Sequence, residues 1–127
     1  MISNYHGSRC PEGENFDCIP TPFDMIKKAN AAGSTVGVQG CEVDSAKDDI
    51  AAAVAAAKDA DVVVMVMGIG QQQEREGQDR YNTTLPGLQT SLAEQVLALG
   101  KPTVLVLIHG GAMSLGPLKE KYTAIVD

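Results

Sequence analysis

Two apolar runs constrain the fold of this chain more than any other feature. Residues 61–68 read DVVVMVMG and residues 102–111 read PTVLVLIHGG, and each run is apolar at successive positions rather than at alternate ones. Such runs are typical of strands buried on both faces, in the middle of a parallel sheet that helices cover on each side. We therefore expect both runs to be inner strands of an α/β fold.

The segments around the first run have the composition of helices. Residues 45–60, SAKDDIAAAVAAAKDA, are rich in alanine, and Asp44 or Ser45 is the candidate N-cap. Residues 86–100 begin with a proline, end with a glycine and carry one apolar stripe, which consists of Leu88, Leu92, Val96 and Leu99. Helices that alternate with strands in this order predict right-handed crossovers and a mostly parallel sheet.

Three weaker segments complete the expected fold. Residues 22–33 predict a short helix that Gly33 ends, residues 35–43 predict a strand weakened by two glycines, and residues 123–127 predict a short last strand. Together the segments predict a three-layer α/β/α sandwich. We expect it to be incomplete at both ends, because the first helix follows no strand and the last strand precedes no helix. Residues 1–127 would then be one partial domain of a longer protein.

Composition excludes several classes of partner and site. The formal net charge of -6 argues against nucleic acid and anionic membranes as partners, no run approaches the roughly 20 apolar residues of a membrane span, and no signal peptide follows Met1. We expect no metal and no cofactor, because no metal-ligand spacing occurs among Cys10, Cys18, Cys41, His6 and His109. Free thiols or one local Cys10 to Cys18 bridge are favoured over any catalytic cysteine.

A strongly polar segment, QQQEREGQDR at residues 71–80, directly follows the first apolar run. In an open parallel sheet the carboxyl ends of the strands gather at one edge, so we expect residues 69–84 and 109–114 to lie together there. Phosphate binding is one candidate function, since Gly68 and Gly70 follow a strand. However, Gln73 stands where the dinucleotide fingerprint needs a third glycine, and no helix opens at once, so a nucleotide-binding Rossmann-like module is the weaker alternative.

Acid/base chemistry is the second candidate for this segment. Three carboxylates, Glu74, Glu76 and Asp79, alternate with Arg75 and Arg80. Such a cluster can keep one carboxyl group protonated while an arginine holds another as an anion. Glycoside cleavage needs this combination, because a neutral acid must protonate the departing oxygen opposite a second carboxylate. Composition alone, however, favours a loop that is simply solvated.

The order of the residues changes that balance. The run GIGQQQEREGQDRYNTTLPGLQTSLAEQV, followed by PTVLVLIHGGAMSL, resembles the C-terminal α/β-sandwich domain of glycoside hydrolase family 3, the β-glucosidases and β-xylosidases. That family carries E-x-E-G-x-D-R in a polar loop after a strand, then L-x-L-P-G-x-Q-x-x-L, then a strand ending in G-G. NYHG at residues 4–7 and TPFDMI at residues 21–26 also look like segments of the family, so the resemblance covers nearly the whole chain.

The resemblance implies that two domains share one active site. A (β/α)8-like barrel would carry the aspartate nucleophile and most contacts to a β-linked sugar, while this domain would lend the general acid/base of a retaining mechanism. By position Glu74 is the first choice for that group and Glu76 the second, and Asp79 and Arg80 are expected to support the loop. The barrel is absent from this chain, so we expect the chain alone to be inactive.

Departures from the family leave other interpretations open. The chain has no tryptophan and no serine-aspartate-tryptophan motif, so the nucleophile and the sugar platform are missing. A non-catalytic interaction domain is therefore a further alternative, and an uncovered apolar surface would favour self-association. We expect a structural role for His109. Members of the family are often secreted or lysosomal or vacuolar, but the sequence decides neither the compartment nor the sugar and its linkage.

Overall fold

The computed structural model describes residues 10–11 and 16–127, and these residues belong to two compact units. One unit ends at Gly37, and the other runs from Val38 to Asp127. The NYHG segment and His6 lie outside the described residues.

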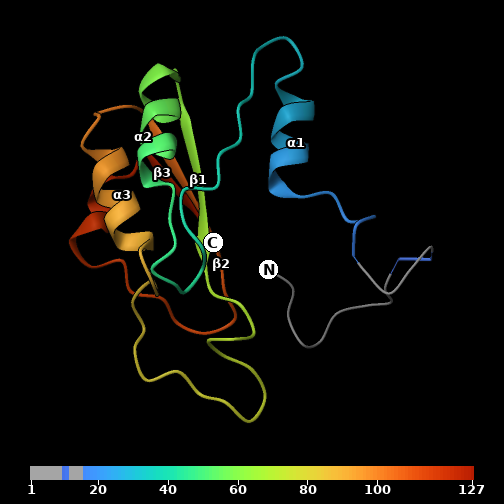
Figure 1. The fold of residues 1–127 in the computed structure, drawn as a ribbon, viewed down its shortest axis with the longest axis vertical. Helices are drawn as coiled ribbons and strands as arrows, with labels where there is room; N and C mark the ends of the chain where they lie inside the picture. The colour runs from blue at the N-terminus through green and yellow to red at the C-terminus, as the bar shows by residue number, and fades with distance from the viewer. Residues whose placement is uncertain (1–9, 12–15) are drawn as a thin grey trace. The chain divides into compact units, whose positions relative to one another are not determined.

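The larger unit contains a parallel sheet of three strands (Figure 1). The strands are β1 (Val63–Gly68), β2 (Thr103–Ile108) and β3 (Ala124–Val126), in the order β1-β2-β3. Met65 lies opposite Leu105, which in turn lies opposite Ile125. The predicted α/β class and parallel sheet are confirmed, as are the strands predicted from the two apolar runs and from the last residues.

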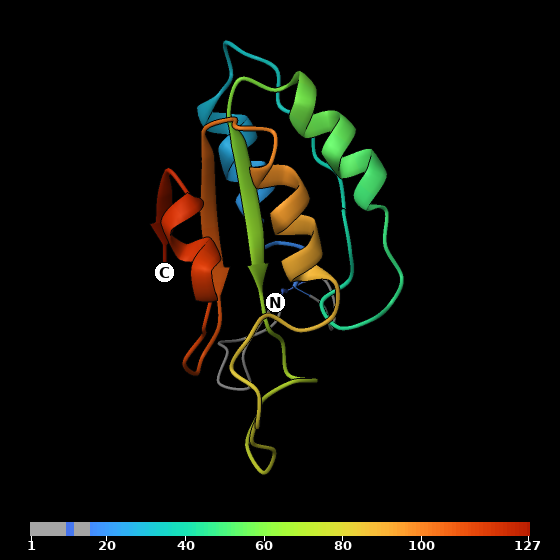
Figure 2. The same ribbon diagram turned by 90° about the vertical axis from the view of Figure 1, so that its left-hand side faces the viewer.

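Helices of the same unit pack on one face of this sheet. They are α2 (Ile50–Asp59), α3 (Gln89–Leu97) and the 3-10 helix η1 (Gly116–Lys121). Figures 1 and 2 show α2 and α3 next to one another on the same side of the strands. Their apolar side chains and those of the strands form one core, made of Ala57, Met65, Met67, Leu85, Ala93, Val96, Leu105, Leu118 and Tyr122. Burial of this layer is the main source of stability for the unit.

The position of β1 differs from the expectation of an inner strand buried on both faces. Among the described residues, β1 lies at the edge of the sheet and pairs only with β2. Val64 and Val66, on the face away from the core, are exposed to solvent. These valines are exposed because the helices of the 38–127 unit pack on the opposite face of the sheet.

Residues 35–43 form no strand because part of the segment packs against helices rather than beside the sheet. A Cβ atom at Gly40 would lie 2.8 Å from the Leu92 side chain of α3 and 2.9 Å from Ala53 of α2. The segment instead ends in an isolated antiparallel bridge between Cys41 and Asp48. Glycine was thus a sign of close approach to helices rather than of a weak strand.

The same bridge shortens the helix predicted at residues 45–60, which begins at Ile50. Ser45 cannot be its N-cap, because the Ser45 hydroxyl accepts a hydrogen bond from the Lys47 amide inside the turn that precedes the helix. Asp49 is the residue before the first turn, and its side chain makes no capping bond. Lys58 lies in the last turn of α2, where a positive charge is favourable.

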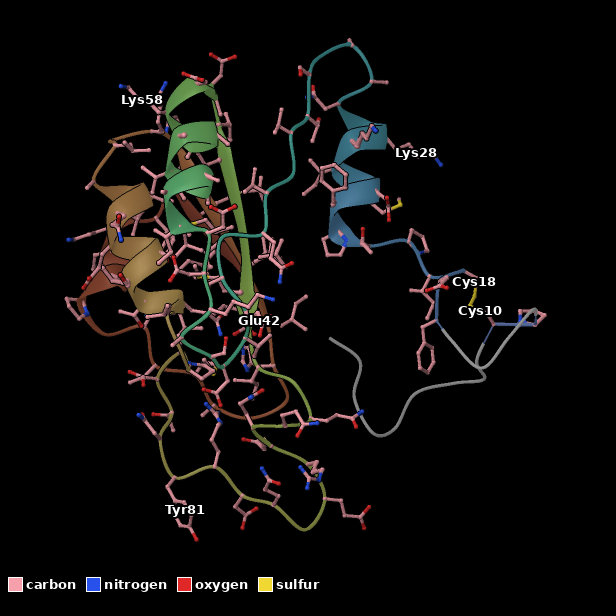
Figure 3. The ribbon with its side chains drawn as sticks, viewed as in Figure 1. Cys10, Cys18, Lys28, Glu42, Lys58 and Tyr81 are labelled. Atoms are coloured by element: carbon pink, nitrogen blue, oxygen red, sulfur yellow. A yellow bond between two sulfur atoms is a disulfide. The ribbon has the colours of Figure 1, made fainter. Side chains whose placement is uncertain are left out.

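The smaller unit contains α1 (Pro22–Ala29) and a disulfide between Cys10 and Cys18 (Figure 3). Thr21 and Asp24 cap the helix reciprocally, and these hydrogen bonds from Thr21 lower the pKa of the Asp24 carboxyl group. The helix ends at Ala29 rather than at Gly33, because the Asn30 side chain donates to the Ser34 carbonyl and turns the chain. None of the helices in the described residues is long and apolar enough to cross a membrane.

Candidate active-site loop

The polar loop at residues 69–84 and the shorter loop at residues 109–114 both leave the carboxyl edge of the sheet. Their origins are adjacent, since Gly68 of β1 lies opposite Ile108 of β2. They are also joined further out, where the Ser114 amide donates to the Thr83 carbonyl over 2.8 Å. The prediction that these loops lie together is confirmed. The parallel arrangement of β1 and β2 explains it, because parallel strands end at the same edge.

Arg80 is the side chain that ties the two loops together. Its Nε donates to Glu74 Oε2 over 2.9 Å, and its Nη2 donates to the Ala112 carbonyl. Its Nη1 lies 3.1 Å from the Met113 sulfur. The Arg80 side chain is only 9% exposed. A guanidinium group suits this place because its planar fork donates in several directions at once.

Glu74 is held at the inner side of the loop. Its carboxylate pairs with Arg80 and is 30% exposed. It also packs against Gly111, where any side chain would collide with both carboxylate oxygens. The Glu74 amide donates to the Gly70 carbonyl over 3.3 Å. The first-choice residue for acid/base chemistry is therefore bonded to its own domain through its carboxylate.

Glu76 has a different setting at the tip of the same loop. The chain reverses between Arg75 and Gln78, whose backbones exchange hydrogen bonds of 3.1 and 2.9 Å. Gly77 has φ +77, a conformation that permits such a tight turn. Glu76 occupies the turn and is exposed to solvent. It is the second-choice residue, and it lies in the part of the loop where the chain turns back.

The two residues expected to support the loop differ in what they do. Arg80 does so through the contacts described above. Asp79 is exposed, and among the described residues it makes no ion pair with Arg80 or any other cation. The sequence did not reveal the role of Asn82, whose Oδ1 accepts from the Thr84 amide and hydroxyl at 3.0 and 2.9 Å. An Asn two residues before a Thr is a known turn signal and could have indicated this.

Amide side chains hold the start of the loop. Gln73 Oε1 accepts from the Gly70 amide over 2.9 Å, and Gln73 Nε2 donates to Asp44 Oδ2 over 3.3 Å. His109 shapes the second loop, since its Nδ1 lies 2.5 Å from the Gly111 carbonyl oxygen. That contact agrees with the structural role expected for His109.

Two shallow hollows flank the loop, and most of the residues that line them are polar. One is lined by Asp44, Gln72, Gln73, Asp79, Arg80, Tyr81, Asn82, Thr84 and Pro86, and the other by Gln39, Glu42, Val43, Asp44, Gly70, Gln72 and Gln73. Tyr81 is fully exposed and lies at the far end of the loop (Figure 3). Within residues 10–11 and 16–127, histidine, cysteine and carboxylate side chains form no cluster suited to a metal ion.

Comparison with known proteins matches this arrangement to one family. The family model described as the glycosyl hydrolase family 3 C-terminal domain matches residues 1–127. The chain belongs to glycoside hydrolase family 3. The family resemblance seen in the polar loop and in the P-G-x-Q segment is thereby confirmed, and the chain corresponds to the family's C-terminal domain.

Relatives of this family 3 domain include β-xylosidases from distant organisms. The chain is 39% identical to Beta-D-xylosidase 3 of Arabidopsis thaliana over 129 residues, which cover 99% of this chain and 15% of that protein. It is 37% identical over 90 residues to a Beta-xylosidase of Formosa agariphila, which covers 70% of the chain and 12% of the relative. The chain thus spans a small part of the curated relatives it matches.

Solved structures agree with the family and the fold. A β-glucosidase of Erythrobacter marinus superposes with a TM-score of 0.67 at 37% identity, over 79% of this chain and 17% of that one. A family 3 exo-β-xylosidase, solved in complex with a xylobiose aziridine probe, superposes with a TM-score of 0.67 at 31% identity, over 80% and 14% of the two chains.

Proposed function

We propose that this chain is part of a retaining β-glycosidase of the β-xylosidase or β-glucosidase type. In this proposal loop 69–84 supplies the general acid/base to an active site that a (β/α)8-like barrel, outside this chain, completes. The substrate would be a terminal β-linked sugar, as in the xylosidases and glucosidases to which the chain is similar. The observation that carries the proposal is an exposed carboxylate, Glu76, at the tip of a loop that buried polar side chains hold in place.

The geometry favours Glu76 over Glu74 as the acid/base, which reverses the order expected from sequence position. A proton donor that serves a second domain must project from its own domain toward the sugar. Glu76 occupies an exposed tight turn. Glu74, in contrast, pairs with Arg80 and packs on Gly111. We assign Glu74 the role of an anchor that fixes the loop, and Glu76 the role of the group that exchanges the proton.

The proposed mechanism has two steps. In the first, an aspartate of the barrel attacks the anomeric carbon while protonated Glu76 gives its proton to the departing oxygen, so the glycosidic bond breaks and a glycosyl ester forms. In the second, the Glu76 carboxylate takes a proton from water, which attacks the anomeric carbon and releases the sugar and the aspartate. Each step leaves Glu76 ready for the next.

The test uses the longer enzyme that contains this chain, with Glu76→Ala and Glu74→Ala compared on aryl β-xylosides and β-glucosides. For Glu76→Ala we expect kcat on phenyl glycosides, whose leaving group needs a proton, to fall by about 100- to 10,000-fold. Dinitrophenyl glycosides, whose leaving group needs no proton, should still react well in the first step. Added azide should then be recovered as glycosyl azide. Glu74→Ala should slow phenyl glycosides less than Glu76→Ala does and gain nothing from azide, because the Glu76 carboxylate is still present.

Two results would change the assignment. If Glu74→Ala shows the leaving-group dependence and azide rescue while Glu76→Ala does not, the roles of the two residues are exchanged. If neither variant shows them, the acid/base lies outside this chain and the loop is a support. The nucleotide-binding alternative has no helix directly after Gly70 to hold a phosphate, because residues 71–74 form a turn.

One observation supports the interaction alternative for the chain on its own. Val64, Val66 and Val126 expose the face of the sheet that carries no helix of the 38–127 unit. We propose that isolated chains associate through this valine face, because apolar surface is stabilised by removal from water. Light scattering tests this directly. The proposal expects the apparent mass to rise with concentration and to return toward that of a monomer in Val64→Lys, whereas equal masses would exclude it.

A further inference from the structure

Gln89, the first residue of α3, has a buried side chain with an unusual set of bonds. It is only 3% exposed. Its Oε1 accepts from the Gly68 amide over 2.8 Å, and its Nε2 donates to the Gly68 carbonyl over 2.8 Å and to the Val43 carbonyl over 2.9 Å. The side-chain amide therefore uses both of its donors and its acceptor on backbone groups far away in sequence.

Two of these bonds replace a missing strand at the edge of the sheet. Gly68 ends β1, which within residues 10–11 and 16–127 has a strand neighbour on one side only. On that side the backbone at Gly68 is so close to Ile108 that any Cβ atom would collide with the Ile108 carbonyl. On the other side Gln89 bonds both the N–H and the C=O of Gly68, as the peptide groups of a neighbouring strand would. The last residue of β1 is therefore fixed from both sides.

The third bond brings in another segment at the base of the loop. Beside Val43, the Asp44 carboxylate accepts from Gln73 within the loop. Gly87, two residues before Gln89, has φ +59 and would place a Cβ atom 3.0 Å from the Ser45 amide. A side chain at this position would push residues 43–45 away from the loop. The turn before α3 thus lets this segment approach, and Gln89 bonds it to the end of β1.

We infer that Gln89 is a positioning residue for the proposed acid/base loop. It fixes the residue from which the loop departs and the segment on which Gln73 rests. A shift at Gly68 would be carried along the chain to the turn that presents Glu76. Proton transfer requires hydrogen-bond distance between the Glu76 carboxyl group and the departing oxygen. If the start of the loop were less firmly held, the rate would therefore fall, although Gln89 touches no substrate. This inference rests on the proposed function of the loop.

The first experiment measures hydrogen exchange and does not depend on catalytic activity. Gln89→Met, of similar length, removes all three bonds, and Gln95→Met on the exposed side of the same helix is the matched control, because Gln95 bonds only Ser91 over 3.4 Å. Hydrogen exchange of the 127-residue chain should accelerate at Gly68 and within residues 69–78 by about tenfold or more in Gln89→Met relative to the control. Amides of β2 should keep the same protection in both variants.

The second experiment measures kinetics in the longer enzyme. For Gln89→Met we expect kcat on a phenyl β-xyloside to fall by about 100-fold with KM little changed, because the sugar contacts are expected in the barrel. The fall on a dinitrophenyl β-xyloside should be much smaller. Gln89→Asn keeps the amide but shortens its reach, so it should give an intermediate effect and serves if Gln89→Met does not fold.

The outcomes separate positioning from stability. A purely structural Gln89 would lower kcat equally on both substrates, through less folded enzyme, and that result overturns the inference. Equal loop exchange in Gln89→Met and Gln95→Met also overturns it. If the loop loosens as expected while neither Glu74→Ala nor Glu76→Ala shows leaving-group dependence, the proposed function fails and the bonds of Gln89 still hold the base of this loop.

Discussion

The covered face of the sheet and the polar loop beyond its edge are ordered by different interactions. Beneath the sheet, Leu105 is completely buried among apolar side chains of α2, α3 and η1. In the loop and at its base, the polar side chains of Arg80 and Gln89 each bind backbone carbonyls of other segments. Apolar packing is spread over many contacts, whereas each of these polar groups makes bonds that few neighbours could replace.

This difference predicts how each region fails. Loss of one apolar side chain from the core should lower the free energy of unfolding of the whole unit. Loss of one buried polar group in the loop should release a local segment while most of the sheet remains folded, because the sheet does not depend on the loop for its packing. Local and global measurements on the same variants therefore test the comparison.

The largest expected effect is that of Leu105→Ala. Leu105 lies at the centre of the sheet with 0% exposure, so its truncation should leave a cavity and lower the free energy of unfolding by about 2–5 kcal/mol. Urea unfolding followed by circular dichroism measures this. Val66→Ala on the uncovered face of β1 is the control and should cost about 1 kcal/mol or less. Equal losses would mean that the valine face is covered in solution.

The next effect lies where the core meets the loop. At Gly68→Ala the new methyl group would collide with the Ile108 carbonyl, and φ +145 is strained for alanine. We expect a loss of about 1–3 kcal/mol in the free energy of unfolding, together with faster exchange at Ile69, whose amide donates to Ile108. Gly110→Ala is the control, because no atom lies within 4 Å of its Cβ position. Similar losses in the two variants would contradict the close approach.

The elements that the sequence predicted well are those whose pattern is local. The runs at β1 and β2 and the apolar stripe of α3 are visible in short windows, because a continuous apolar run or a helical stripe lies within a few consecutive residues. The prediction of a strand at residues 35–43 was wrong, since a strand also needs a neighbouring strand to pair with. Gly40 in this segment is explained by Leu92 of α3, a contact between residues distant in sequence that no local pattern contains.

The third effect compares two arginines of the same loop. Arg80→Met removes the ion pair with Glu74 and the bond to Ala112, and should cost about 1–2 kcal/mol in the free energy of unfolding. Exchange at the Ser114 amide, which bonds Thr83 between the two loops, should rise more than exchange in β2. Arg75→Met should change stability by less than about 0.5 kcal/mol, because the Arg75 side chain is exposed and bonds the Gln71 carbonyl of its own loop.

A result in which Arg75→Met costs as much as Arg80→Met would show that the loop is held by general charge balance rather than by the Arg80 bonds. Arg80→Lys sharpens the same test. Lysine keeps the charge but has no planar fork, so it should recover only part of the stability that arginine provides.

The sequence located the loop but not the pairing of its charges. Parallel strands end at one edge, which was enough to bring residues 69–84 and 109–114 together. The choice of Glu74 as the partner of Arg80 depends on the turn at Arg75 to Gln78, which reverses the chain and returns Arg80 alongside Glu74. Three carboxylates lie within six residues of Arg80, so spacing alone favoured none of them.

The smallest effect is on the pKa of the Cys41 thiol. It tests whether the segment beside the loop is shielded from water as the core is. Burial raises the pKa of the Cys41 thiol above its ordinary value, and the nearby Asp48 carboxylate adds to the rise. The thiolate should therefore form at higher pH in the native chain than in urea, where the thiol has its ordinary pKa of about 8.5. The midpoint of the pH dependence of iodoacetamide alkylation measures this, since steric shielding changes the rate but not the midpoint.

Asp48→Asn should lower the midpoint in the native chain without restoring the value in urea, because burial is the larger cause. Equal native and denatured midpoints would mean that water reaches this segment freely. The segment that contacts the loop would then be solvated rather than buried.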